Sequence, residues 1–123
     1  MLIFVGLGLQ SNGLSIRGLE SLEDADSIYA ELYTSLIPDS SLSNLSDEIG
    51  EEIKVLDRER IEDDPSEVLE SASKGKTILL VPGDPMIATT HIDLRLRAEK
   101  AGIETKIIHG ASIETAAPGL VGL

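Results

Sequence analysis

Apolar residues fall into short continuous runs separated by segments with helical spacing. The run LIFV at 2–5 shows no polar alternation and leads into glycine, which is typical of a strand buried on both faces. The run TILLV at 77–81 gives the strongest strand signal in the chain. Further strands are predicted at 26–33, 53–57 and 104–109, of which 53–57 is the weakest.

Three segments have the spacing and the end signals of helices. In residues 14–25, Leu and Ile recur at roughly helical spacing with acidic side chains opposite them. Residues 63–75 and 89–102 each carry acidic residues early, basic residues late and a glycine at the end. We therefore predict a helix in each of the three segments.

Two shorter helices are predicted from capping signals. The segment after the second strand begins as a loop rich in Ser and Pro. Its later part forms a short helix with Asn44 or Ser46 as the N-cap and Gly50 as the stop. The other short helix covers 111–119 and is cut by Pro118.

Strands and helices alternate with short connections, which indicates parallel strands joined by helical crossovers. We predict an α/β fold, with three layers (α/β/α) around a mainly parallel sheet of about five strands. The length of 123 residues suits one domain. We assign residues 1–117 to that domain and the apolar, uncharged residues 118–123 to the start of an interdomain linker.

Charge and composition narrow the classes of partner. The chain has 22 acidic and 10 basic residues, a formal net charge of −12. This balance disfavours direct binding to nucleic acid or to anionic membranes, because both require an excess of Lys and Arg. The acidic runs are expected to be solvated faces: EDAD (23–26), DEIGEE (47–52) and RERIEDD (58–64).

The amino-terminal sequence bears on the compartment, whereas the cysteine count gives no information about it. The chain contains no cysteine, so disulfides and thiolate chemistry are excluded. The start, MLIFVGLGLQ, lacks a positively charged region, and no run approaches the ~20 apolar residues of a membrane helix. We predict a cytoplasmic protein that does not associate with a membrane.

Three unusual loops follow predicted strands: GLGLQ (6–10), PGDPMIATT (82–90) and HGASI (109–113). In an open parallel sheet, ligands bind outside the carboxyl ends of the strands. We therefore expect the three loops to meet at one edge of the sheet and to form a ligand site there.

Each loop also has a purely structural interpretation. GLGL has Ser11 at the third glycine of GxGxxG and lacks the lysine of a P-loop, so it can be simply a close-packed turn. Asp84 either stabilises its own turn or faces a polar ligand, and spacing alone does not decide. Ser112 is expected to cap the last helix, with Glu114 near the capping-box position, and the same geometry can offer helix N–H groups to a ligand carboxylate.

The two histidines give no metal site. His91 and His109 are separated by a helix and a strand, and no cysteine or third histidine is present. His91 is expected on the surface of its helix.

Four segments together resemble the amino-terminal half of the diphthine synthases, a family of the S-adenosylmethionine-dependent tetrapyrrole methylase superfamily. They are FVGLGL (4–9), LSIRGLESLEDADSIYAELYTS (14–35), VPGDPMIATTHIDLRLRA (81–98) and IIHGASI (107–113). The combination of GDPxxATTH with HxASI is the specific part, and the match is weakest over 36–75.

The resemblance implies a methyltransferase that acts on the amino group of a modified histidine in translation elongation factor 2, a step of diphthamide biosynthesis. Its methyl donor is S-adenosyl-L-methionine, its product is S-adenosyl-L-homocysteine, and the enzyme is typically a homodimer. The resemblance places the cofactor contacts of this half on Leu9, Asp84, Ile87, Ser112 and Ile113. It supplies no general base.

In the family, a second domain completes the cofactor cleft, and this domain is absent from the present chain. We therefore expect this chain to fold and to be inactive or very weakly active alone. Two alternatives stay open: a relative that methylates a tetrapyrrole or ribosomal RNA, and an isolated folding or dimerisation module without a ligand. The acidic balance argues against RNA.

Overall fold

The computed structural model of the chain describes residues 1–35 and 39–123. The predicted strands and helices are all present, together with one wide helical turn, η1, that was not predicted. In chain order the elements are β1 (Leu2–Gly6), α1 (Ile16–Ser21), β2 (Ser27–Ala30), α2 (Asp39–Ile49), β3 (Lys54–Val55), η1 (Glu59–Asp63), α3 (Ser66–Lys74), β4 (Thr77–Val81), α4 (His91–Lys100), β5 (Thr105–Ile108) and α5 (Ile113–Leu120).

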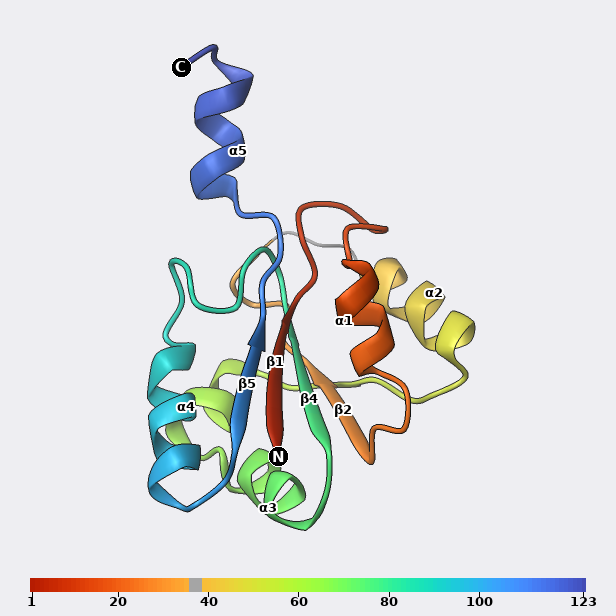
Figure 1. Ribbon diagram of the computed structural model, residues 1–123, viewed down its shortest axis with the longest axis vertical. Helices are drawn as coiled ribbons and strands as arrows, with labels where there is room; N and C mark the ends of the chain where they lie inside the picture. Colours follow the sequence, from red (N-terminus) through yellow and green to blue (C-terminus); the bar gives the residue numbers. More distant parts are fainter. Residues whose placement is uncertain (36–38) are drawn as a thin grey trace.

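The five strands form one sheet in the order β3-β2-β4-β1-β5, and every neighbouring pair is parallel (Figure 1). The predicted α/β fold with a five-stranded sheet is therefore confirmed. All residues of β1 and β4 are buried, as their unbroken apolar runs predicted. Because all strands run the same way, the loops that follow β1, β4 and β5 leave the same edge of the sheet.

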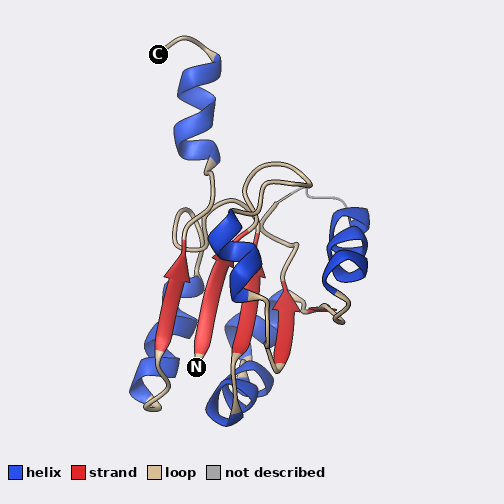
Figure 2. Cartoon of the chain, turned by 45° about the vertical axis from the view of Figure 1, so that its right-hand side comes forward, coloured by secondary structure: helices blue, strands red, loops and turns tan. Residues whose placement is uncertain are grey.

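Helices cover both faces of the sheet (Figure 2). On one face, Ile3 and Val5 of β1 pack in a cluster that includes Leu42 and Leu45 of α2 and Leu22 at the end of α1. On the other face, the alternate residues of β1 and β4 pack with the inner sides of η1, α3 and α4. The result is the three-layer arrangement that alternating crossovers require.

Two predicted helix ends are wrong. Helix α2 begins at Asp39, so Asn44 and Ser46 lie inside the helix and do not cap it, whereas Gly50 does end it, with φ +72°. Helix α5 continues through Pro118 to Leu120. Proline removes one helical N–H donor. Because α5 has no buried residue, water can satisfy the carbonyl group that is left without that donor.

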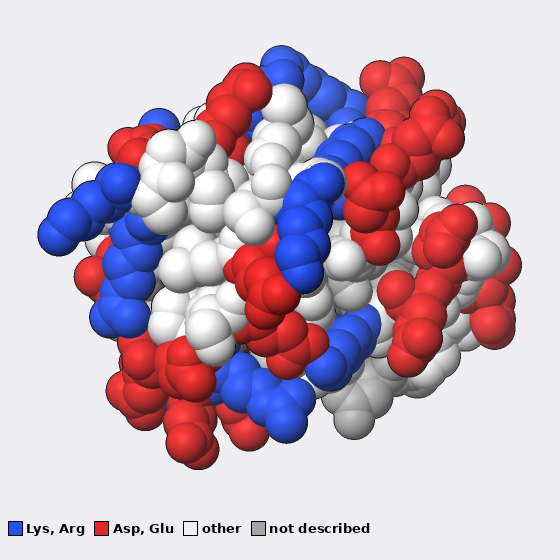
Figure 3. All heavy atoms as spheres, turned by 90° about the horizontal axis from the view of Figure 1, so that it is seen from below, with Lys and Arg blue, Asp and Glu red and all other residues white. Residues whose placement is uncertain are grey.

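The acidic runs are exposed as predicted, with two exceptions in 58–64. Ile61, at the centre of η1, is buried in the core, and Glu62 accepts a hydrogen bond from the Thr90 hydroxyl at 2.7 Å. In the view from the amino-terminal edge of the sheet, basic side chains are interspersed with acidic ones (Figure 3). None of the helices among the described residues is both long enough and apolar enough to cross a membrane.

Candidate functional site at the carboxyl edge of the sheet

The three loops after β1, β4 and β5 meet through their main chains. Gly83 donates its N–H to the Gly8 carbonyl at 2.9 Å, and Gly8 donates to the Gly83 carbonyl at 3.2 Å. A Cβ on Gly6 would lie 2.5 Å from the Gly83 oxygen and 2.6 Å from the Gly110 nitrogen, so no side chain fits there. We call these four residues the glycine seam, and they confirm that the three loops converge on one edge.

Around this seam lie the five residues predicted to contact a cofactor, and we call this region the loop rim. Leu9, Ile87 and Ile113 are 43%, 42% and 57% exposed, one from each loop. Asp84 and Ser112 are buried beside them. The loop rim therefore exposes aliphatic surface next to buried polar side chains.

Asp84 is held by both of its carboxylate oxygens. Its Oδ1 accepts the Met86 N–H at 2.9 Å, which confirms the turn-stabilising interpretation. Its Oδ2 lies 2.7 Å from Nδ1 of His109. The Asp84 side chain is 3% exposed and that of His109 is 74% exposed. The pattern of the sequence did not indicate this pair, because the two residues come from different loops.

Ser112 caps α5, as predicted. Its Oγ accepts the Glu114 N–H at 3.2 Å, and its carbonyl accepts the N–H groups of Thr115 and Ala116. The loop that ends at Ser112 is therefore fixed to α5, which leads away from the body of the domain (Figure 1).

The loop after β4 contains one unfavourable backbone conformation. Ala88 has φ +54°, a left-handed conformation that residues with a Cβ adopt at a cost. The Thr89 hydroxyl donates to the Pro85 carbonyl at 3.0 Å and accepts the His91 N–H at 3.3 Å. These bonds close the loop on itself and hold Ala88 in place.

The prediction that His91 lies on a helix surface is wrong. His91 and Glu31 are both completely buried, with Nε2 of His91 2.8 Å from Oε1 of Glu31. The Thr34 hydroxyl donates to Oε1 at 2.6 Å, and the Thr34 N–H donates to Oε2 at 3.2 Å. A carboxylate held by three donors can remain buried. Glu31 lies within the predicted strand 26–33, directly after the apolar end of β2. An acidic residue at such a position is the sequence signal that could have identified a buried acid.

Tyr33 packs beside this buried pair. Its ring lies edge-on to His91 with ring centroids 6.3 Å apart, and the Arg58 guanidinium lies 4.9 Å from its centroid. Burial raises the pKa of the Tyr33 hydroxyl, and the neighbouring Glu31 carboxylate raises it further. The surroundings of Tyr33 therefore favour the neutral phenol over the phenolate.

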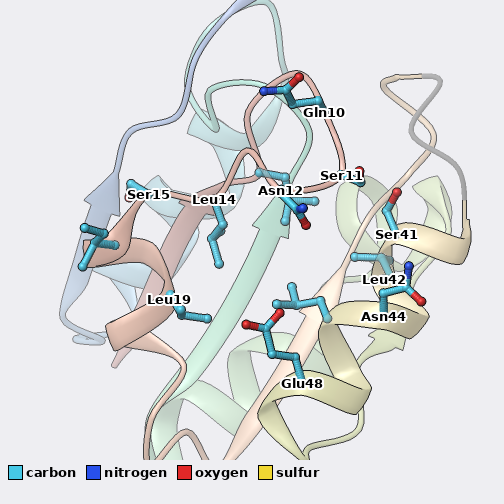
Figure 4. Close-up of a pocket in the computed structure, with 13 residues that line it drawn as sticks. Gln10, Ser11, Asn12, Leu14, Ser15, Leu19, Ser41, Leu42, Asn44 and Glu48 are labelled. Carbon is cyan, nitrogen blue, oxygen red and sulfur yellow. The ribbon is translucent and has the colours of Figure 1, made fainter.

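A separate groove of about 380 Å³ opens between α1, α2 and the loop after β1 (Figure 4). Its apolar lining comes from leucines of all three segments, including Leu14, Leu19 and Leu42. Polar side chains from the loop and from α2 surround the opening, namely Gln10, Ser11, Asn12, Ser41, Asn44 and Glu48. No cluster of three or more His, Cys, Asp or Glu side chains suited to a metal ion occurs in 1–35 or 39–123.

Comparison with known proteins agrees with this architecture. The family model of the tetrapyrrole (corrin/porphyrin) methylases matches residues 1–123. A diphthine synthase from Methanocella arvoryzae is 50% identical over 125 aligned positions, and one from Halorubrum lacusprofundi is 45% identical over 124. These alignments cover 100% of this chain and 49% and 47% of the two relatives, so the chain spans about half their length.

A solved structure described as a crystal structure of diphthine synthase superimposes with a TM-score of 0.93 at 45% sequence identity. That superposition covers 99% of this chain and 49% of the other. The predicted resemblance to the diphthine synthases is confirmed over the whole chain, including residues 36–75, where it was weakest. The chain belongs to the tetrapyrrole methylase family.

Proposed function

We propose that this chain is the amino-terminal half of an S-adenosylmethionine-dependent methyltransferase of the diphthine synthase type. Its substrate is the amino group of the modified histidine of translation elongation factor 2, and its product feeds diphthamide formation. The observation that carries the proposal is the convergence of three loops on one seam, in a chain that matches diphthine synthases throughout.

The loop rim fits the chemistry of the methyl donor. S-Adenosylmethionine combines a largely apolar adenosine with a charged amino-acid tail. Leu9, Ile87 and Ile113 expose aliphatic surface on which an adenosine can pack. Asp84 and Ser112 are buried beside them and fix the shape of the loops that carry the aliphatic side chains. The close main-chain contact at the seam holds the three loops together, which keeps the exposed aliphatic side chains on one edge.

When bound, the sulfonium supplies an electrophilic methyl group for in-line attack by an amine. The residues of this chain bind, orient and exclude water from the reacting groups, which supplies much of the rate acceleration in such a transfer. The amine must be neutral to attack, so its proton must be lost before methyl transfer.

We further propose that residues 1–117 are one domain and that 118–123 begin the connection to a second domain, which completes the cleft in a homodimeric cytoplasmic enzyme. Support comes from α5, which has no buried residue and ends at Leu120, 84% exposed, followed by Val121, 72% exposed. Such an apolar end fits a segment that is covered in a larger assembly. The alignments cover 49% of the Methanocella arvoryzae relative and 49% of the solved chain, which supports a second domain in the proposed enzyme.

Isothermal titration of the chain with S-adenosylhomocysteine tests the proposal. We expect weak binding that is lost on Asp84→Ala, because this change releases the loop after β4 from the rim. Gly119→Ala, which meets nothing within 4 Å in α5, serves as the matched control and should bind like the wild type. The absence of binding heat and of NMR shifts in the three loops would favour a folding or dimerisation module without a ligand.

A further inference from the structure

We propose that Asp84 and His109 form a carboxylate–imidazole dyad in which His109 is the general base of methyl transfer. The inference rests on the proposed function, since it concerns the proton that the acceptor amine must lose. It assigns to Asp84 the role of holding the base, in addition to its role in the loop after β4.

In this pair Asp84 is buried and held in place, whereas His109 is exposed. The Asp84 side chain is 3% exposed, and its second oxygen is already engaged by the Met86 N–H at 2.9 Å. The His109 side chain is 74% exposed, and its Nδ1 lies 2.7 Å from the free oxygen of Asp84. A buried carboxylate thus positions an imidazole that remains accessible to a substrate.

This contact fixes the tautomer of the ring. An ionised carboxylate only accepts hydrogen bonds, so Nδ1 of His109 must carry the proton in the pair. In the neutral ring, Nε2 is then an unprotonated lone pair. Within the part of the chain that the structure describes, Nε2 has no hydrogen-bond partner, and Asp84 is the only ion-pair partner of the ring.

The position along the chain puts this lone pair at the loop rim. His109 directly follows β5 and directly precedes Gly110, whose main chain lies against Gly6 and Gly83 in the seam. The ring is tied across the rim to Asp84, which comes from the neighbouring loop. The base and the exposed aliphatic side chains are therefore offered on one edge of the sheet.

The proposed step balances as follows. Nε2 of His109 takes a proton from the ammonium group of the acceptor, which leaves a neutral amine and an imidazolium. The amine lone pair forms a bond to the methyl carbon of S-adenosylmethionine, while the carbon–sulfur bond breaks and its electron pair stays on sulfur. The imidazolium, stabilised by Asp84, then loses its proton to solvent, which its exposure permits.

Glu31 and His91 are the other histidine–carboxylate pair of this edge, and they cannot serve as the base. Both side chains are completely buried and Nε2 of His91 is already bound to Glu31, so neither nitrogen can reach a substrate without rearrangement of the core. Asp84 with His109 is the pair that combines anchoring with access.

The test uses a chimera in which this chain is continued by the carboxyl-terminal half of the Methanocella arvoryzae relative. We expect His109→Gln to lower the rate of methyl transfer at pH 7 by about 100- to 10,000-fold, the usual contribution of a general base. Binding of S-adenosylhomocysteine should change less than about twofold, because the base removes a proton and does not hold the donor. Added imidazole should restore part of the rate, and the deficit should shrink at high pH, where the amine loses its proton unaided. Lys106→Gln, an exposed change in β5 three residues before His109, is the matched control.

A second measurement is independent of methyl transfer. Nitrogen NMR of the imidazole rings in the 123-residue chain should show His109 as the Nδ1–H tautomer, and Asp84→Asn should abolish that preference. A mixture of tautomers in the wild type would overturn the dyad. In an active chimera, an unchanged rate of methyl transfer for His109→Gln would overturn only the assignment of His109 as the general base. A wild-type chimera that neither binds S-adenosylhomocysteine nor transfers a methyl group would overturn the proposed function itself, and with it the role of His109 as the general base.

Discussion

Two histidine–carboxylate pairs lie at the carboxyl edge of the sheet, with nearly equal contact distances and opposite surroundings. Glu31 and His91 are 2.8 Å apart and both completely buried. Asp84 and His109 are 2.7 Å apart, but the histidine is 74% exposed. The contact distance therefore does not decide what a pair does. Burial does, because it determines both the cost of losing a partner and the access of a substrate.

The largest expected effect is on the buried pair. His91→Leu leaves the Glu31 carboxylate in the core without its imidazole partner, and we expect the free energy of unfolding in urea at pH 7 to fall by about 3–5 kcal/mol. The double change Glu31→Gln with His91→Leu should recover part of that loss, because the stranded charge is gone. A single-mutant loss below about 1 kcal/mol would contradict the comparison.

A substitution in the glycine seam should have the next largest effect on the free energy of unfolding. Gly6→Ala places a methyl group 2.5 Å from the Gly83 carbonyl oxygen, which forces two loops apart. We expect a loss of about 1–3 kcal/mol in unfolding free energy, together with weaker binding of S-adenosylhomocysteine. Gly119→Ala is the control: it should be neutral or stabilise by up to about 1 kcal/mol, as in an open helix.

The open pair should contribute little to stability. For His109→Gln we expect a change in unfolding free energy of about 0–1 kcal/mol, because the imidazole is largely solvated. The same urea titration measures it beside His91→Leu. If the two histidine changes cost the same, burial would not be what separates the pairs.

The smallest effect at neutral pH is expected for Tyr33→Phe. The Tyr33 hydroxyl is buried without a hydrogen-bond partner among the described residues, so removing it should be nearly neutral at pH 7. Because the folded pKa is raised, the native state binds this proton more tightly than the unfolded chain does. The stabilisation is complete below the unfolded pKa of about 10 and is lost as pH rises above it. Unfolding experiments between pH 9 and pH 11 (about one unit either side of that pKa) should show a shallower decline for Tyr33→Phe than for the wild type.

The sequence predicted the sheet and the edge that carries the site, because unbroken apolar runs and short crossovers restrict the possible topologies strongly. It did not predict either histidine–carboxylate pair. Glu31 meets His91 only because β2 lies next to β4, and Asp84 meets His109 only because the loops after β4 and β5 converge over β1. Strand order sets these contacts, and no local pattern records it. The cofactor contacts stay predictions for all five residues: Leu9, Asp84, Ile87, Ser112 and Ile113.

The glycine seam bears on how this family can diversify. Its contacts are made by main-chain atoms of Gly6, Gly8, Gly83 and Gly110, so they do not depend on the exposed side chains at positions 9, 87 and 113. Substitutions at positions 9, 87 and 113 can therefore change the surface offered to a ligand while the main-chain contacts of the seam persist. A new ligand contact at this edge does not require a new backbone.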